Sequence, residues 1–338
     1  MTSYYRPILH SDPHRPDGAL TLAGGWLWFT HVEVLERGQG GRLVLAQDVP
    51  AAVRDRLTTP RADVAGLALD TPRIMGILNV TPDSFSDGGL FDDPAAALAH
   101  ARAMEAVGAD ILDIGGESTR PGAAEVCVDD EVARTAPVIA AIRAGSAVPI
   151  SIDTRKAPVA QAAIAAGASM VNDVAAFTYD PALADVTAKA QVPVCLMHAQ
   201  GDPETMQADP RYDDVLLDVY DFLEARIAMA EAAGIARNQI IIDPGIGFGK
   251  TLQHNVTLLR GLSLYHSLGC AILLGASRKR FIGTLGHAPD AQDRVAGSVA
   301  VALHGVAQGV QILRVHDTKE TRQALNLHMA MSGQASDG

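Results

Sequence analysis

The most constraining feature of the sequence is an alternation, repeated eight times from Arg73 onward, of a short apolar run with an alanine-rich stretch of helical length. Continuous apolar runs are typical of strands that are buried on both faces, as in parallel sheets. Eight such units predict an α/β fold in which the strands close into a (β/α)8 TIM barrel. An open, doubly wound sheet is the main alternative, because the same alternation would build it.

The ends of the apolar runs set the expected boundaries. We expect strands at 73–79, 111–115, 149–153, 170–173, 192–197, 240–243, 271–275 and 312–315. We expect helices near 94–107, 129–143, 157–166, 181–190, 213–233, 254–267, 293–308 and 318–331. In a barrel of this kind the active site lies at the carboxyl ends of the strands. The residues that end each strand are therefore the first candidates for chemistry.

The chain before the repeat follows a different pattern. It reads as a loose polar arm at 1–18, a β-rich stretch at 21–49, a short helix at 50–57 and a further strand at 65–69. We therefore divide the chain into a small N-terminal α+β extension of unknown role at 1–70, a barrel domain at 71–332 and a frayed tail at 333–338.

The composition argues against several classes of protein. The chain has 338 residues, of which 48% are hydrophobic and 20% charged, so it can form a substantial core. Its formal net charge of -12 argues against nucleic acid or an anionic membrane as a partner. Three scattered cysteines without a CxxC pair argue against a disulfide framework or a structural zinc site. Without an apolar signal core or a membrane-length apolar run, the chain is expected to be cytoplasmic.

Three polar residues at strand ends form a first candidate group. Asp153, Asn172 and Asp243 end the third, fourth and sixth expected strands. Two carboxylates and a carboxamide pointing inward suit a flat heterocycle with an amidine edge, because carboxylates accept paired N–H donors and the amide both donates and accepts. Any one of them alone is more simply explained as a strand-end cap or a salt-bridge partner. Three in register favour a binding pocket.

A second candidate group combines cationic side chains with hydroxyl groups. It comprises Thr119, Arg120, Ser277, Lys279, Arg314 and His316, with Asn79 opposite. Arginine forks, hydroxyls and glycine-rich loops are what a phosphate or diphosphate needs. Asn79 offers a hard oxygen ligand for Mg²⁺, which usually keeps waters and bridges substrate phosphates. Taken alone, the basic run 278–280 would be a solvated loop and His316 a hydrogen-bonded core histidine.

The glycine-rich stretch 245–251 suggests nucleotide binding, but its spacing is wrong. A P-loop requires glycine five residues before Gly249, and Pro244 stands there. The dinucleotide-binding fingerprint fails as well, since the three glycines alternate.

Several motifs together resemble one family. Residues 76–89 (GILNVTPDSFSDGG) resemble the opening signature of the dihydropteroate synthases, and 115–122 (GGESTRPG) resemble its second signature loop. The segments IDTRK at 152–156, NDV at 172–174, DPGIGFGK at 243–250, SRK at 277–279 and RVHD at 314–317 follow in the family's order. The resemblance covers about residues 73–331 and leaves the extension outside it.

The resemblance implies a reaction and a distribution of roles. The family condenses 6-hydroxymethyl-7,8-dihydropterin diphosphate with 4-aminobenzoate to give 7,8-dihydropteroate and pyrophosphate, a step of folate biosynthesis. Asp153, Asn172, Asp243 and Lys279 would hold the pterin; Asn79, Arg314 and His316 the diphosphate, with Mg²⁺ on Asn79; and Thr119, Arg120 and Ser277 would lie near the aminobenzoate and the diphosphate. We expect Asp153, Arg120 and Lys279 to be the catalytic residues. A homodimer and sensitivity to sulfonamides are further expectations.

Two other functions use part of the same pattern. A methyltransferase acting on methyltetrahydrofolate would share the pocket of Asp153, Asn172 and Asp243, but it would not need the motifs around Arg120, Lys279 and Arg314. A non-catalytic pterin-binding protein would be favoured by loss of a diphosphate ligand, and the sequence shows no such loss.

The loops at 80–93 and 116–128 carry no apparent core of their own, and we expect them to close over the site and exclude water. Replacing Asp83 or Phe85 should then reduce turnover more than pterin binding, because the lid acts after the pterin is seated. Steady-state kinetics beside pterin titrations would check this, and an equal loss of both would count against a lid.

Overall fold

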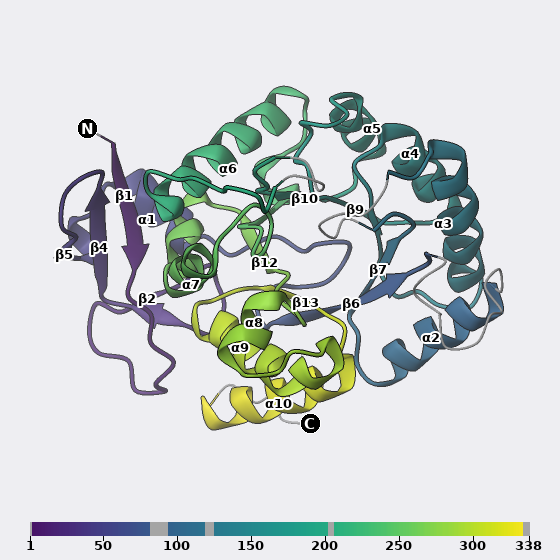
Figure 1. The fold of residues 1–338 in the computed structure, drawn as a ribbon. Helices are drawn as coiled ribbons and strands as arrows, with labels where there is room; N and C mark the ends of the chain where they lie inside the picture. The colour runs from purple at the N-terminus through teal and green to yellow at the C-terminus, as the bar shows by residue number, and fades with distance from the viewer. Residues whose placement is uncertain (1, 82–93, 119–124, 202–205, 334–338) are drawn as a thin grey trace.

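The computed structural model describes residues 2–81, 94–118, 125–201 and 206–333, and its centre is a closed barrel of eight parallel strands (Figure 1). The strands follow the chain in order around the barrel: β6 (Arg73–Asn79), β7 (Ile111–Gly115), β8 (Ile150–Asp153), β9 (Met170–Asp173), β10 (Val194–Met197), β11 (Ile240–Asp243), β12 (Ala271–Leu274) and β13 (Ile312–Val315). β13 pairs with β6 and completes the ring. The expectation of a (β/α)8 barrel is confirmed.

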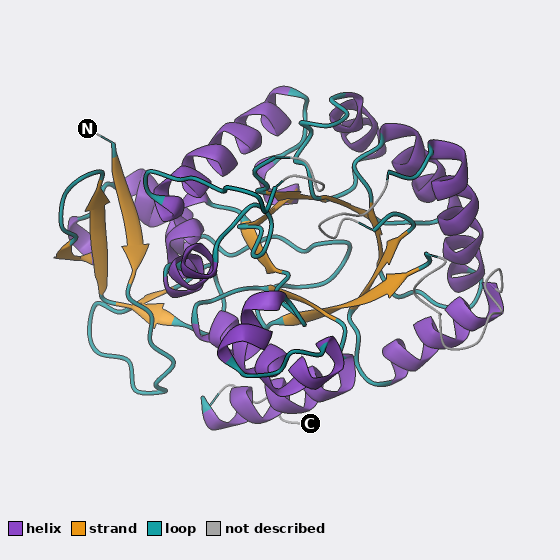
Figure 2. Cartoon of the chain, viewed as in Figure 1, coloured by secondary structure: helices purple, strands orange, loops and turns teal. Residues whose placement is uncertain are grey.

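Helices cover the outside of the barrel, as the purple ring around the orange strands in Figure 2 shows. Among the described residues these are α2 (Pro94–Ala106), α3 (Val128–Arg143), α4 (Ala157–Ala166), α5 (Ala182–Ala190), α6 (Val215–Ala232), α7 (Leu252–Arg260), α8 (Arg280–Leu285), α9 (Val295–Ala307) and α10 (Thr318–Met331). None of the helices in this part of the chain is both long and apolar enough to cross a bilayer.

The strand boundaries differ from the expected ones at two prolines and at the end of β12, which lies at Leu274 and not at Gly275. β8 begins at Ile150 and β10 at Val194, after Pro149 and Pro193. Each proline takes part in the sheet through its carbonyl alone, accepting from the backbone N–H of Leu112 or Val171. Because proline has no N–H to donate, the full strand starts one residue later.

The expectation of one helix over 254–267 is wrong. α7 ends at Arg260, and a 3-10 helix over Leu262–Leu268 follows. Gly261 separates the two, and a Cβ there would come within 2.5 Å of a methyl carbon of Leu216 on α6. The close approach of α6 therefore requires glycine at the break, a constraint that the sequence pattern does not reveal. The short helix α8 was also not expected.

The extension forms two small antiparallel sheets beside the barrel (Figure 1). One sheet contains β1 (Ser3–Pro7), β4 (His31–Glu36) and β5 (Arg42–Leu45), and the other contains β2 (Leu20–Thr21) and β3 (Trp28–Phe29). A helix, α1 (Ala51–Thr58), follows. The expectation of a loose arm over 1–18 is therefore wrong for its first residues, which pair with β4. The expected strand at 65–69 is reduced to one bridge between Val64 and Leu67.

Polar contacts attach the extension to the outer helices. The Tyr4 hydroxyl donates to Asp221 on α6 over 3.0 Å, and Arg37 pairs with the same carboxylate at 2.7 Å. Trp26 donates its indole N–H to the carbonyl of Val306 on α9 over 3.1 Å. These contacts join the extension to two separate parts of the ring of helices.

The last part of the extension closes the amino end of the barrel. Val64 and Leu69 are buried and pack in one cluster with inward-facing residues near the starts of the strands, namely Met75, Ile111, Met170, Cys195, Ile241, Ala271, Leu273 and Ile312. The amino end of the barrel interior is thus filled with apolar side chains. The opposite end is left for polar ones.

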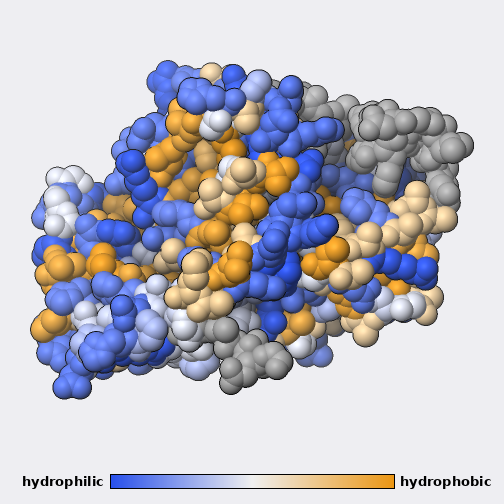
Figure 3. All heavy atoms as spheres, turned by 90° about the horizontal axis from the view of Figure 1, so that it is seen from below, coloured by the Kyte–Doolittle hydropathy of each residue, from blue (hydrophilic) through white to orange (hydrophobic). Residues whose placement is uncertain are grey.

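The face drawn in Figure 3 has apolar residues in groups between hydrophilic ones. Among the described residues, the exposed large apolar side chains include Leu43 on β5, which is 61% exposed.

Leu69→Ala should lower the free energy of unfolding by about 2–5 kcal/mol, because it leaves a cavity between the extension and the barrel floor. Leu43→Ala is the matched control and should change it by less than about 0.5 kcal/mol, since that side chain is exposed. Urea denaturation of both variants checks the difference. Equal effects would contradict a packing role for Leu69.

Candidate active site

Polar side chains replace the apolar ones toward the carboxyl ends of the strands. Asp153, Asn172 and Asp243 are all buried, with 6%, 3% and 4% of their surfaces exposed. Asp153 and Asn172 are register partners on β8 and β9. Asp243 ends β11, two strands further around the ring. All three belong to the same end of one barrel, as the sequence predicted.

Arg314 on β13 links residues from several strands. Its Nε donates to Asp113 over 2.6 Å, and its Nη2 donates to Asp153 over the same distance. Burial opposes its positive charge, but the two carboxylates more than offset this and raise the pKa of Arg314. The guanidinium is therefore fixed as a cation inside the barrel. Its position beside Asp153 was not foreseen when it was grouped with the diphosphate ligands.

Asp113 on β7 is a residue that the sequence reasoning missed. It is completely buried and accepts from the side-chain amide of Asn172 over 3.3 Å as well as from Arg314. The available signal was its place between Leu112 and Ile114, in the middle of an otherwise apolar strand. Burying a carboxylate is unfavourable unless it is paired, so a charge in such a run indicates a buried partner.

Asp243 is held by the loop that follows it. Its Oδ1 accepts from the backbone N–H of Gly245 over 2.7 Å. Gly245 has φ +67°, and a Cβ there would lie 1.8 Å from the carbonyl oxygen of His198, so only glycine fits. Burial raises the pKa of the Asp243 carboxyl, and the neighbouring Lys279 partly offsets the rise.

Lys279 brings a second cation to the same region. Its ammonium donates to the carbonyl of Ile246 and lies 4.4 Å from the ring centroid of Phe248, close enough for a cation–π contact. Burial lowers the pKa of Lys279 to about 8, although Asp243 favours its charged form. The strand-end loops after β11 and β12 therefore contribute to one site.

Ser277 and His316 lie together. The Ser277 hydroxyl oxygen accepts from the backbone N–H of His316 over 3.2 Å and is 3.1 Å from its Nδ1. Arg278 turns away from this pair to form an ion pair with Asp317. In the loop after β12, Ser277 therefore contacts His316, whereas the next residue, Arg278, pairs with Asp317.

Asn79 ends β6, half-buried, and is the one expected metal ligand. Its Oδ1 lies 3.5 Å from the position of a Cβ on Gly115, the residue paired with it on β7. The described residues contain no cluster of three or more histidine, cysteine, aspartate or glutamate side chains suited to a metal ion. A single amide oxygen fits Mg²⁺ only where waters and substrate phosphates complete its coordination.

Thr119 and Arg120 lie outside the described residues, as do Asp83 and Phe85. Residues on either side of 119–124 are described. Glu117 accepts from the backbone N–H of Val126 over 3.0 Å, and Lys156 donates to the Val126 carbonyl over 2.6 Å. Lys156 also pairs with Glu117 at 3.1 Å. Buried charges therefore hold Glu117 and Val126 to Lys156, the residue that precedes α4.

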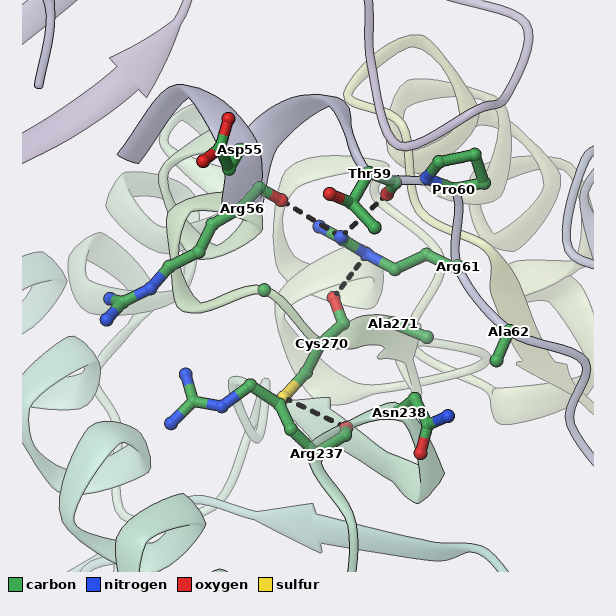
Figure 4. Close-up of a pocket in the computed structure, with 11 residues that line it drawn as sticks. Asp55, Arg56, Thr59, Pro60, Arg61, Ala62, Arg237, Asn238, Cys270 and Ala271 are labelled. Atoms are coloured by element: carbon green, nitrogen blue, oxygen red, sulfur yellow. Dashed lines mark hydrogen bonds between the residues drawn. The ribbon is translucent and has the colours of Figure 1, made fainter. Parts of the chain in front are cut away.

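A cavity of about 280 Å³ lies at the opposite end of the barrel (Figure 4). The turn after α1 and the start of β12 contribute to its lining. Arg61 crosses it and donates to the backbone carbonyls of Cys270 at 3.1 Å and Arg56 at 2.9 Å. None of the expected site residues lines this cavity. Arg61 instead fastens the extension to the barrel.

The family model of the pterin-binding enzymes matches residues 75–316 of the chain. The dihydropteroate synthase of Neisseria meningitidis serogroup B is 51% identical over 270 residues, which cover 78% of this chain and 94% of that protein. The chain belongs to the pterin-binding enzyme family.

Within this family the chain is a dihydropteroate synthase, and so a transferase. The solved dihydropteroate synthase of Xanthomonas albilineans with 4-aminobenzoic acid is similar, with a TM-score of 0.76, 50% identity, and coverage of 80% of this chain and 98% of that one. The Yersinia pestis enzyme in complex with a sulfonamide drug has the same TM-score, 47% identity, and coverage of 80% and 99%. The family and the fold expected from the motifs are confirmed.

The pKa of Lys279 predicts how activity changes with pH. The ammonium is charged below about pH 8, so if the charge is needed, kcat/KM should fall about tenfold per pH unit above that value. Lys279→Arg should remove this fall, since a guanidinium stays charged. Lys319→Arg, at an exposed position on α10, is the control, and its kcat/KM should still fall at alkaline pH. Pyrophosphate release between about pH 6 and 10 checks this. An unchanged alkaline fall in Lys279→Arg would contradict it.

Proposed function

We propose that the site joins the methylene carbon of a 6-hydroxymethyl-7,8-dihydropterin diphosphate to the amino nitrogen of 4-aminobenzoate. The observation that carries the proposal is the convergence of Asp153, Asn172 and Asp243 with the cations Lys279 and Arg314 at one end of the barrel. A flat, hydrogen-bonding ring and a polyanion on the same substrate match these two kinds of group. The similarity to dihydropteroate synthases supports the same assignment.

The carboxylates and the amide are proposed to hold the pterin ring. Asp243 accepts N–H donors from the amidine edge of the ring, and Asn172 and Asp153 contact the remainder. An analogue without this edge would leave buried polar groups unpaired, and so the pocket would reject it. Lys279 lies against Asp243 and contributes a donor to the ring.

The diphosphate is proposed to lie toward Arg314, His316 and Asn79. Thr119, Arg120 and Ser277 are proposed to serve the aminobenzoate and the diphosphate from the surrounding loops. When bound on Asn79, Mg²⁺ would neutralise charge on the leaving diphosphate. Cationic side chains act in the same sense, because they stabilise charge that develops on the departing oxygens.

The reaction is proposed to be a largely dissociative substitution. The bond between the pterin methylene carbon and the diphosphate oxygen breaks, and its electron pair leaves with pyrophosphate. Asp153, beside the ring, stabilises the positive charge left on the pterin methylene. The aminobenzoate nitrogen then attacks that carbon and afterwards loses a proton. Exclusion of water at this point prevents hydrolysis of the cation.

The assembly is proposed to be a cytoplasmic homodimer, on the family resemblance. Light scattering at working concentration tests the dimer, and a monomer mass throughout would contradict it. Small molecules are the proposed partners. Sulfonamides are proposed to compete for the aminobenzoate position.

Pyrophosphate release from the pterin diphosphate, with and without 4-aminobenzoate, tests the reaction. Release that depends on aminobenzoate, together with a dihydropteroate product, is expected. Chelation of Mg²⁺ by EDTA should suppress it, and excess Mg²⁺ should restore it. Tight pterin binding without release would contradict the proposed chemistry and favour a pterin-binding protein.

A further inference from the structure

We propose that Asp113 is a positioning residue for the pterin pocket, which fixes the orientations of Asn172 and Arg314 from beneath the substrate. The inference rests on the proposed roles of those two residues. It adds a third buried carboxylate, from β7, to the groups that determine which ligand the pocket accepts.

The first step of the argument is the chemistry of the Asp113–Asn172 contact. An ionised carboxylate accepts hydrogen bonds and donates none. The amide of Asn172 must therefore turn its NH2 group toward Asp113, and the distance between the amide nitrogen and the carboxylate oxygen is 3.3 Å. Because the amide is planar, its oxygen is directed away from Asp113. Asn172 then offers an acceptor to the substrate, and Asp113 determines this polarity.

The second step concerns Arg314. The Nε of this residue donates to Asp113 and its Nη2 donates to Asp153, so two nitrogens of the planar group are fixed at 2.6 Å. With two carboxylates on different strands, the guanidinium cannot rotate without breaking one contact. The N–H groups that remain on Nη1 and Nη2 are therefore held in fixed directions. A contact with Asp153 alone would still allow the guanidinium group to rotate.

The third step is the environment of Asp113. The side chain is completely buried, and both of its donors contact Oδ2. Its Oδ1 has no hydrogen-bond partner among the residues that the structure describes. A carboxylate buried with incomplete hydrogen bonding destabilises the folded protein, so its presence calls for a compensating role. Orientation of the two pocket residues above it is such a purpose.

The charge balance points the same way. Asp113, Asp153 and Arg314 are close enough for their charges to affect one another's protonation. Burial raises the pKa of the Asp153 carboxyl to about 7, Arg314 opposes this rise, and the charge of Asp113 adds to it. Asp113 therefore also affects the protonation of Asp153, through its own charge and through its contact with Arg314.

The test compares Asp113→Asn with Ser151→Ala. Ser151 is the register partner of Asp113 on β8, is also completely buried, and has a hydroxyl without a hydrogen-bond partner among the described residues. It therefore controls for a change of a buried polar group in the same layer. The Asp113→Asn change keeps the size of the side chain but gives it a hydrogen-bond donor beside its acceptor. The amide of Asn172 could then turn either its NH2 group or its oxygen toward position 113.

The readouts are calorimetric binding of 6-hydroxymethyl-7,8-dihydropterin, which lacks the diphosphate, and the two KM values. Asp113→Asn should weaken pterin binding and raise KM for the pterin diphosphate at least about tenfold, the loss expected for a hydrogen bond to a charged group. KM for 4-aminobenzoate should stay within about twofold, whereas a general loss of structure would change both. Ser151→Ala should leave all three within about twofold.

Each remaining outcome has a definite meaning. Pterin binding by Asp113→Asn within twofold of the unaltered protein would overturn the inference, as would parallel changes in both KM values. If Asp113→Asn does not fold by circular dichroism, Asp113→Ser is measured with the same expectations. Failure of both to fold would overturn the inference in favour of a purely structural role. An unaltered protein that does not bind the pterin would instead contradict the proposed function.

Discussion

The pairing of Arg314 with Asp113 and Asp153 is the interaction on which the rest of the site depends. It joins β13, β7 and β8 inside a closed barrel, where each charge would be strongly unfavourable alone. Removing one partner from such a group typically destabilises a protein by about 3–5 kcal/mol, because the other charge is left uncompensated. The three residues are therefore fixed relative to one another, and their positions determine the geometry of the pocket.

The barrel divides its interior between two tasks. At the amino end, Val64 and Leu69 from the extension complete an apolar cluster that contributes stability. At the carboxyl end, the buried Asp243 and the half-buried Lys279 have raised and lowered pKa values respectively, which is the perturbation expected where chemistry needs unusual protonation behaviour. The extension packs on the first end. Its attachment by Arg61 and Trp26 explains why it packs on the barrel instead of hanging free.

How far the sequence could predict the structure depended on the kind of contact. The strands β6, β7, β9, β11 and β13 were predicted to the residue, because a strand buried on both faces is apolar over most of its length. The break at Gly261 could not be predicted, since it results from Leu216 on a different helix. β1 was missed because its pairing with β4 compensates for a polar sequence. The roles of Thr119 and Arg120 stay predictions.

The sequence by itself determined the barrel, the family and the set of strand-end residues, because apolar periodicity and local motifs are properties of neighbours along the chain. Only the tertiary structure decided how those residues pair. It placed Arg314 between two carboxylates, directed the amide of Asn172 by means of Asp113, and turned Arg278 away from the site to Asp317. The physical reason is that hydrogen bonds and ion pairs across a barrel join residues far apart in the chain, such as Arg314 and Asp113 at 201 positions, and no local pattern records them.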